Sequence, residues 1–312
     1  MWLGVIMFAH QVIKDLRHYS SEFKKGCLRC QASKHSRALQ YDSMIPGIIE
    51  SQKFHMGDIY ALYKMFLRDN DKDMFMGDNV VNMELPYSNM WITTTRKREL
   101  NEFVTKEAVW ITKITDIIWF VVHFKYLTDW RWIPLRVASL VVVGGMTQEI
   151  NQFLEKLFPK KVPSFIGSAI VPIVCEASLS QDFINEEIKS TIPNLYVLQN
   201  TIKLLNCKNI QTERISAPQQ LNKKRIRSGK LPIYDYHVLN LVLPSNKNRG
   251  YQEQSVPLSH NRVHLCRGHF KEYTKEHPLF GKYAGLYWWE PSVRGQNRDG
   301  IVMKDYSVKP AS

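Results

Sequence analysis

The residues best suited to chemistry lie between His260 and Val308, where histidines and arginines stand close together. Two histidines, His264 and His269, are candidate catalytic residues. Arginines lie near them in the sequence as candidate anion ligands: Arg262, Arg267 and Arg294. Histidine can transfer a proton near neutral pH, and arginine can stabilise the charge of a phosphate. The combination fits metal-independent cleavage of a phosphodiester, although no spacing fixes these groups within the ~3 Å that proton transfer needs.

The same segment has two other interpretations. Zinc ligands occur in it, at no standard ligand spacing: His260, His264, Cys266 and His269. The pair Cys27 and Cys30 has CxxC spacing, but no second CxxC follows it. In the third interpretation each histidine is packed or hydrogen-bonded within an aromatic-rich sheet. We favour this third interpretation, and we therefore expect no metal, no cofactor and a non-enzyme rather than an enzyme.

A second basic cluster lies at the end of an expected short helix, which begins near Ser216, runs through Gln219 to Arg227 and is capped by Gly229. Its cations are candidate ligands of a phosphate-bearing partner: Lys223, Lys224, Arg225, Arg227 and Lys230. Cations suit the negative end of a helix dipole, but five within eight residues exceed what that effect requires. Because like charges this close repel one another, a bound anion would relieve the repulsion.

Large aromatic residues accompany these cations. Trp288 and Trp289 are adjacent, so in a regular strand they face opposite sides, and one of them is expected to leave the local core. Aromatic rings that stack on bases, together with lysine and arginine on the backbone, hold nucleic acid without sequence preference. Both tryptophans are therefore candidate nucleic-acid ligands. The alternative is that aromatic residues in strands form the core of their own sheet.

Charge is distributed unevenly along the 312 residues. Residues 1–45 carry seven Lys and Arg against three Asp and Glu, a net charge of +4. Residues 46–217 carry nineteen of each, and residues 218–312 carry sixteen against seven, a net charge of +9. The excess predicts an anion-facing C-terminal module on a neutral body. With 44% hydrophobic residues, the chain can bury sizeable cores, which argues against global disorder.

Hydrophobic periodicity predicts an α+β fold in three parts. Residues 1–45 are expected to form a basic amphipathic helix, from about Val5 to Lys24, and a polar tether from Lys25 to Ser43. Residues 46–215 would form a mixed α/β body with a helical middle, in which Pro193 separates two helices. Residues 216–312 would form a module made of the basic helix and an antiparallel sheet of about four strands.

The sequence also bears on location. No uncharged run reaches the ~18 apolar residues that a membrane crossing needs, and the opening MWLGVIMF lacks the basic residues and cleavage site of a signal peptide. Five cysteines, thinly spread, argue against a secreted disulfide scaffold and favour a reducing compartment. We therefore expect a cytoplasmic protein without a membrane partner.

The C-terminal third resembles an uncharacterised protein family that recurs in bacteriophage and prophage genomes. The resemblance spans Leu221 to about Val308 and rests on LNKKRIRSGKLPIYDYHVLNL, VHLCRGHFKEYT, HPLFGKYAGLYWW and VRG. A weaker similarity lies in MELPYSNMW, from Met83 to Trp91. The family carries a histidine two residues before the final Arg-Gly, where this chain has Ser292, Val293, Arg294 and Gly295. The resemblance implies phage ancestry and a bacterial cytoplasm, and it implies no reaction.

Three functional hypotheses follow. The first is an accessory protein of phage type that associates with nucleic acid through its basic, aromatic-rich C-terminal module. The second is a phage factor that binds a host protein, for instance one of a defence system, because aromatic residues with arginine are typical of interface hot spots. The third is a histidine-dependent phosphodiesterase. We favour the first, since it asks the least of the sequence.

Overall fold

The computed structural model describes residues 8–26, 32–56, 84–98, 101–126, 131–144, 147–150, 152, 170–174, 180–242, 263–266, 269–289, 292–294 and 301–302. Within these residues the principal helices are α1 (Ala9–Gly26), α2 (Ala32–Glu50), α5 (Gln181–Asn206) and α6 (Gln219–Arg227). Helices and strands are mixed along the chain, which confirms the α+β class.

One large sheet dominates the described part of the chain. It contains β1 (Gln52–His55), β2 (Asn89–Arg98), β3 (Asn101–Lys113), β4 (Ile118–Tyr126), β5 (Trp132–Pro134), β6 (Val137–Val142), β7 (Ile170–Val174), β8 (Ile210–Ile215) and β9 (Tyr236–Leu241). The order is β7-β6-β4-β3-β2-β1-β9-β8, and β5 pairs with β4. Most neighbours are antiparallel, whereas β1 runs parallel to both β2 and β9.

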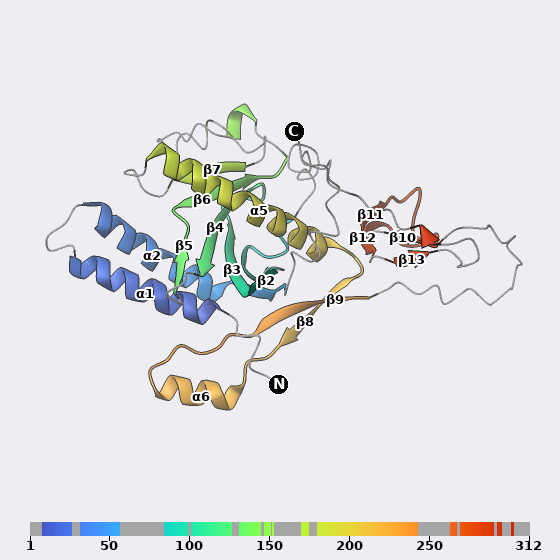
Figure 1. Ribbon diagram of the computed structural model, residues 1–312. Coiled ribbons are helices and arrows are strands. Elements are labelled where there is room, and N and C mark those ends of the chain that lie inside the picture. The colour runs from blue at the N-terminus through green and yellow to red at the C-terminus, as the bar shows by residue number, and fades with distance from the viewer. Residues whose placement is uncertain are drawn as a thin grey trace, which may run out of the picture.

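Helices cover the two faces of this sheet (Figure 1). On one face α1 and α2 pack on side chains that include Trp91, while on the other α5 packs on a cluster that includes Met90 and Ile92. These three neighbours in β2 alternate between the two clusters because successive side chains of a strand point to opposite faces. Both faces being covered, β6 is buried along its whole length, a pattern usual for strands with helices on either side.

The N-terminal part is helical throughout its described length. Helix α1 agrees with the expected helix, but the expected tether from Lys25 to Ser43 is wrong, since α2 begins at Ala32. The first half of α2 is polar, which is why the segment reads as a tether. Its last two turns, however, bury Met44, Ile45 and Ile48 against the sheet. Packing of this kind, more than local propensity, stabilises helices in proteins.

The helical middle is also different from the prediction. Helix α5 continues through Pro193, where two helices were expected, and it is followed by strand β8. The apolar residues on both sides of the proline explain the continuity, because Ile188 and Leu195 are both buried on the same helix. The sequence offers both Ser180 and Asp182 as N-terminal caps of this helix, and in the structure the Ser180 side chain accepts a hydrogen bond from the Phe183 N–H.

The predicted single C-terminal sheet of about four strands is wrong. Strand β9 joins the large sheet, and the rest divides into β11 (His269–Tyr273) paired with β12 (Gly285–Trp289), and β10 (Val263–Cys266) between β13 (Ser292–Arg294) and β14 (Ile301–Val302). The large sheet offers β9 two partners, β1 and β8. The expected boundary between residues 215 and 216 therefore falls between two paired strands, with Ile215 opposite Tyr236.

A search of the described helices for a membrane span found none with sufficient length and hydropathy.

Candidate anion-binding surface

Helix α6 ends where the sequence predicts. Gly229 has a φ of 67°, a left-handed conformation that glycine adopts without steric cost. The Lys230 N–H donates to the Arg225 carbonyl, and the Gly229 N–H donates to the Ile226 carbonyl. This pair of bonds is the Schellman arrangement, which satisfies carbonyls at a helix end and turns the chain sharply. The chain after α6 therefore doubles back along the helix.

Side chains of α6 hold the returning segment, residues 231–235. The Asn222 amide brackets Ile233, donating to its carbonyl at 2.8 Å and accepting from its N–H at 2.7 Å. Arg225 Nε donates to the Leu231 carbonyl at 2.8 Å. Asp235 accepts hydrogen bonds from the Ala217 N–H and from Arg214, and these bonds hold the pKa of its carboxyl below the usual value. Asp235 thus ties the returning segment to Arg214 and Ala217, just before α6.

The other cations of α6, and Lys230 just after the helix, are exposed to solvent. No residue of the helix is buried. Within the described residues, Lys223, Lys224, Arg227 and Lys230 are exposed and form no ion pair with an acidic side chain. The structure therefore divides the predicted cluster: Arg225 has a structural role, and the other four cations form an uncompensated basic surface.

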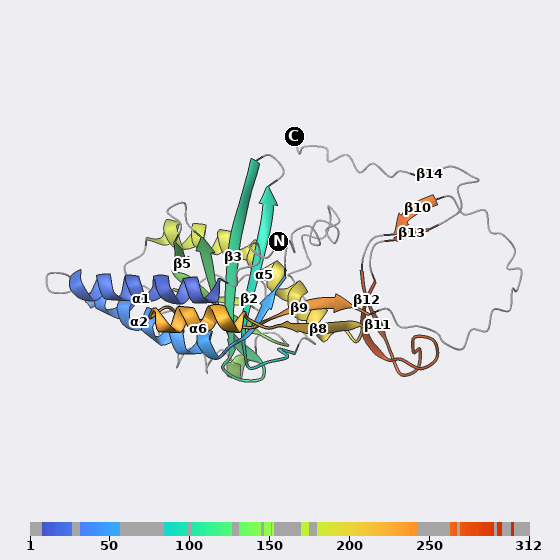
Figure 2. The same ribbon diagram turned by 90° about the horizontal axis from the view of Figure 1, so that it is seen from below.

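This surface lies on the same side of the molecule as α1. In both ribbon views the two helices extend along a similar direction (Figures 1 and 2), and in Figure 1 the chain that returns from α6 passes between them. Leu231 and Tyr234 pack against the cluster that contains the buried face of α1. Arg17 of α1 is close enough to Tyr234 to act electrostatically on its hydroxyl, whose pKa burial raises and Arg17 partly lowers. The basic helices α1 and α6 therefore lie on one face of the described structure.

A buried lysine that sequence reasoning missed anchors the same segment. Lys53 is 4% exposed, and its Nζ donates to the carbonyls of Ile49 and Ser51 while lying 4.5 Å from the ring centroid of Tyr234. Burial lowers the pKa of its amine to about 8. Lys53 thus caps the end of α2 and positions Tyr234. A lone lysine in a short strand carries no sequence signal for such a role.

The predicted histidine and arginine constellation lies largely outside the described residues. Arg262, Arg267 and His260 are among the residues that the structure does not describe. For His264, Cys266, His269 and Arg294 only the backbone is described. His264 pairs with Arg294 across β10 and β13, and His269 pairs with Trp289 across β11 and β12. His264 and His269 therefore belong to different sheets.

The two tryptophans have different surroundings. Trp288 is 4% exposed, packs against Leu204 and Cys207 of the α5 end, and lies 4.9 Å from the ring centroid of Phe270. This burial agrees with the alternative in which the aromatic residues of the strands form a core, and it leaves Trp288 little exposed face for a base. Trp289 is half-buried. The side chain that fixes this arrangement is Asn209, which donates to the Trp288 carbonyl and accepts from its N–H.

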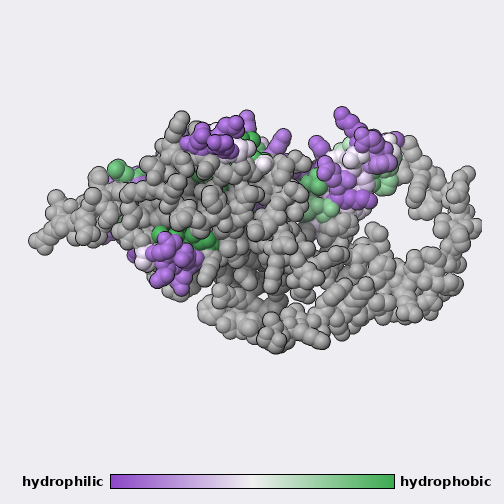
Figure 3. Space-filling model, turned by 90° about the horizontal axis from the view of Figure 1, so that it is seen from above, coloured by the Kyte–Doolittle hydropathy of each residue, from purple (hydrophilic) through white to green (hydrophobic). Residues whose placement is uncertain are grey.

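Exposed aromatic residues occur instead at the turn between β11 and β12. Phe280 and Tyr283 are 45% and 43% exposed, and Phe280 has a φ of 53°, a left-handed conformation that is strained for a bulky residue. In the space-filling view the hairpin is the coloured cluster at the right, where hydrophobic and hydrophilic groups adjoin (Figure 3). The sequence does not distinguish either residue from its aromatic neighbours, because exposure depends on how the hairpin docks.

Comparisons with known proteins gave no match to a family model, to a curated protein or to a solved structure.

Proposed function

We propose that this protein associates with nucleic acid through the basic surface of α6 and the adjoining part of α1. The observation that carries the proposal is the state of the α6 cations: Lys223, Lys224, Arg227 and Lys230 are exposed and lack acidic partners among the described residues. Closely spaced cations that are neither buried nor paired raise the local positive potential, which phosphate groups neutralise. Arg17 extends the same potential onto α1.

The resemblance of the C-terminal third to a phage and prophage protein family supports an accessory role in a bacterial host cell. An accessory protein of this kind needs no reaction of its own, and contacts with a phosphate backbone suffice for it to bind DNA or RNA without sequence preference. The phage context is part of the proposal, as is a cytoplasmic location.

The test is binding of fluorescently labelled single-stranded and double-stranded oligonucleotides at a series of salt concentrations. Replacing Lys223, Lys224 and Arg227 by glutamine should weaken binding and reduce the slope of log K against log salt. The slope should fall by roughly 0.7 to 0.9 for each phosphate that the variant no longer neutralises, so by about 2 to 3 for the triple variant. Arg225 stays unchanged in this variant because it holds Leu231.

A matched control removes three lysines elsewhere. Lys271, Lys275 and Lys282 are exposed on the β11–β12 hairpin, so their replacement by glutamine changes the net charge of the protein equally. If binding depends on α6, this control keeps most of the salt slope of the wild type. Equal losses of affinity in both triple variants would reduce the effect to net charge and overturn the assignment to α6.

A second candidate function is binding of a host protein through the hairpin turn. The exposed Phe280, held in a strained backbone conformation, and the neighbouring Tyr283 favour it, since aromatic side chains dominate interface hot spots. Recovery of one host protein by the wild type, and its loss with Phe280→Ala, would favour this function over nucleic-acid binding.

A further inference from the structure

The second half of α1 presents polar residues along one face, and this face borders a shallow hollow of about 470 Å³. The hollow is lined by five residues of α1 and one of α2: Arg17, Ser20, Ser21, Lys24, Lys25 and Asp42. The α1 residues follow the spacing i, i+3, i+4, i+7 and i+8, which places them on one side of a helix. The cations and hydroxyls therefore border the same hollow from one side of α1.

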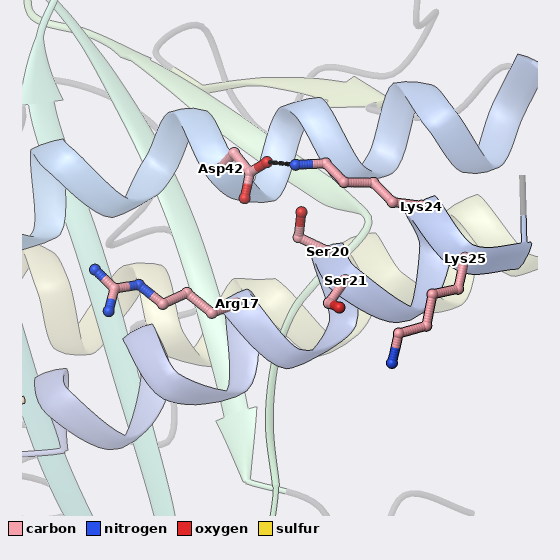
Figure 4. Close-up of a pocket in the computed structure, with 6 residues that line it drawn as sticks. All are labelled: Arg17, Ser20, Ser21, Lys24, Lys25 and Asp42. Atoms are coloured by element: carbon pink, nitrogen blue, oxygen red, sulfur yellow. Dashed lines mark hydrogen bonds and ion pairs between the residues drawn. The ribbon is translucent and has the colours of Figure 1, made fainter. Parts of the chain in front are cut away.

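The single carboxylate of the hollow is already neutralised. Lys24 Nζ donates to Asp42 Oδ2 at 2.6 Å, and this bond holds the pKa of the Asp42 carboxyl below its ordinary value. Figure 4 shows Lys24 reaching across to Asp42, with Lys25 on one side of the two serines and the Arg17 side chain extending away from them on the other side. The charge available to a ligand is therefore that of Arg17 and Lys25.

These two cations are held loosely or not at all by acidic groups. Arg17 forms no ion pair with any residue in the described ranges, and Lys25 pairs only with Glu22, at 3.0 Å, through two side chains that are each more than half exposed. An exposed pair of this kind contributes little free energy, so an anion can displace Glu22. A guanidinium, an ammonium and hydroxyls are the donors that phosphate oxygens accept from.

The helix dipole explains only part of the positive charge beside this hollow. Lys24 and Lys25 lie in the last turn of α1, where positive charge suits the helix dipole. That effect falls off within one turn, and Arg17 lies more than two turns before the end of α1. Neither does the dipole account for two serines beside the cations. We propose that the hollow between α1 and α2 is a binding site for a phosphate group, with Arg17, Ser21 and Lys25 as its donors.

This site does not depend on the proposed function, because free phosphate, a phosphorylated small molecule and the phosphate of a nucleic acid share the same oxygens. The test follows the amide NMR signals of Ser20 and Ser21 in the full-length protein during titration with inorganic phosphate. Saturable shifts are expected in the wild type. Arg17→Gln should weaken binding about tenfold, the effect of losing one charge-assisted hydrogen bond.

Lys14→Gln is the matched control. Lys14 is an exposed cation of the same helix that does not line the hollow, so its removal changes the charge equally and should leave the affinity unchanged. A second variant, Ser21→Asp, places a carboxylate at an exposed position in the hollow and should abolish binding while α1 stays folded, as circular dichroism would verify. The absence of saturable shifts in the wild type, or equal weakening by Arg17→Gln and Lys14→Gln, would overturn the site.

The sources of the phosphate are separated with oligonucleotides of one sequence, with and without a 5′-phosphate. A terminal phosphate in the hollow predicts tighter binding of the phosphorylated form, and Arg17→Gln should remove only that increment. Shifts with inorganic phosphate but equal affinity for the two oligonucleotides would assign the site to a free or small-molecule phosphate. Loss of all oligonucleotide binding would overturn the proposed function alone, since the response of Ser20 and Ser21 to inorganic phosphate is measured separately.

Discussion

Helix α6 and the β11–β12 hairpin both belong to the C-terminal third, yet they are attached to the body in opposite ways. The hairpin is fixed by buried groups, with Trp288 in an apolar cluster and Asn209 bonded to the Trp288 backbone. The helix buries no residue and is held by polar side chains such as Asn222 and Arg225. Trp288 of the hairpin therefore stabilises its attachment to the body, whereas most cations of α6 remain available to a partner.

Of the changes considered, Trp288→Ala should lower the stability of the fold the most. The substitution empties the space between the hairpin and the end of α5, and deletions of large buried aromatic side chains cost roughly 3–5 kcal/mol. Urea denaturation followed by circular dichroism measures the loss of stability. Tyr283→Ala serves as the control, because this tyrosine lies in the same hairpin but is 43% exposed, and a destabilisation comparable to that of Trp288→Ala would contradict the burial contrast.

The buried histidine His123 in the sheet should make the folding stability depend on pH. His123 is 1% exposed, and within the described structure neither ring nitrogen has a hydrogen-bond partner, so burial lowers its pKa to about 3. The unfolded chain binds a proton below about pH 6.5 while the folded chain does not, so folding stability falls as pH drops from 6.5 towards 3, by roughly 3 kcal/mol at pH 4. Denaturation midpoints across this range should vary less with pH in His123→Leu. An unchanged pH dependence would mean that His123 is protonated in the fold.

Asn209→Leu should separate the polar part of the hairpin attachment from the apolar part. The variant leaves the N–H and carbonyl of Trp288 without their partner in a buried place, which costs roughly 1–3 kcal/mol. The same substitution at Asn240 is the control, since that side chain is exposed and bonds only to Glu213 in the described structure. Thermal denaturation of the two variants should differ clearly, and similar melting temperatures would show that the Asn209 bonds add nothing.

The smallest effect distinguishes two neighbours within α6. Arg225→Gln removes the bond to the Leu231 carbonyl and should destabilise the fold by about 1 kcal/mol, whereas Lys224→Gln should change stability by less than about 0.5 kcal/mol. Oligonucleotide binding should be weakened by the Lys224 substitution even though stability is unaffected. A destabilisation by Lys224→Gln equal to that by Arg225→Gln would remove the distinction between the structural cation and the free ones.

The elements with strong local signals were predicted well. The end of α6 at Gly229 and the cap of α5 at Ser180 follow from residue types that satisfy helix ends in any context. Predictions failed where distant packing decides the outcome. Helix α2 has a polar start and an internal proline, yet Met44, Ile45 and Ile48 give it an apolar face that the sheet buries.

The candidate site shows the same division. The cations of α6 were found from sequence because their density is a local property. The roles of Arg225, Lys53 and Trp288 were not, since each depends on contacts with residues far along the chain or on burial. The hollow beside Arg17 could not be expected either, because Asp42 comes from a helix predicted to be a tether.

Sequence alone predicts the α+β class, the ends of helices such as α6, and the concentration of positive charge at the two ends of the chain. These are properties of composition and short-range periodicity, and they hold wherever the segments lie. Long-range contacts, by contrast, place β9 in the sheet of the body, bury Trp288 in the core, and bring basic α1 and basic α6 onto one face (Figure 2). The physical reason is that strand pairing and burial act between residues distant in sequence, whose mutual fit no local pattern encodes.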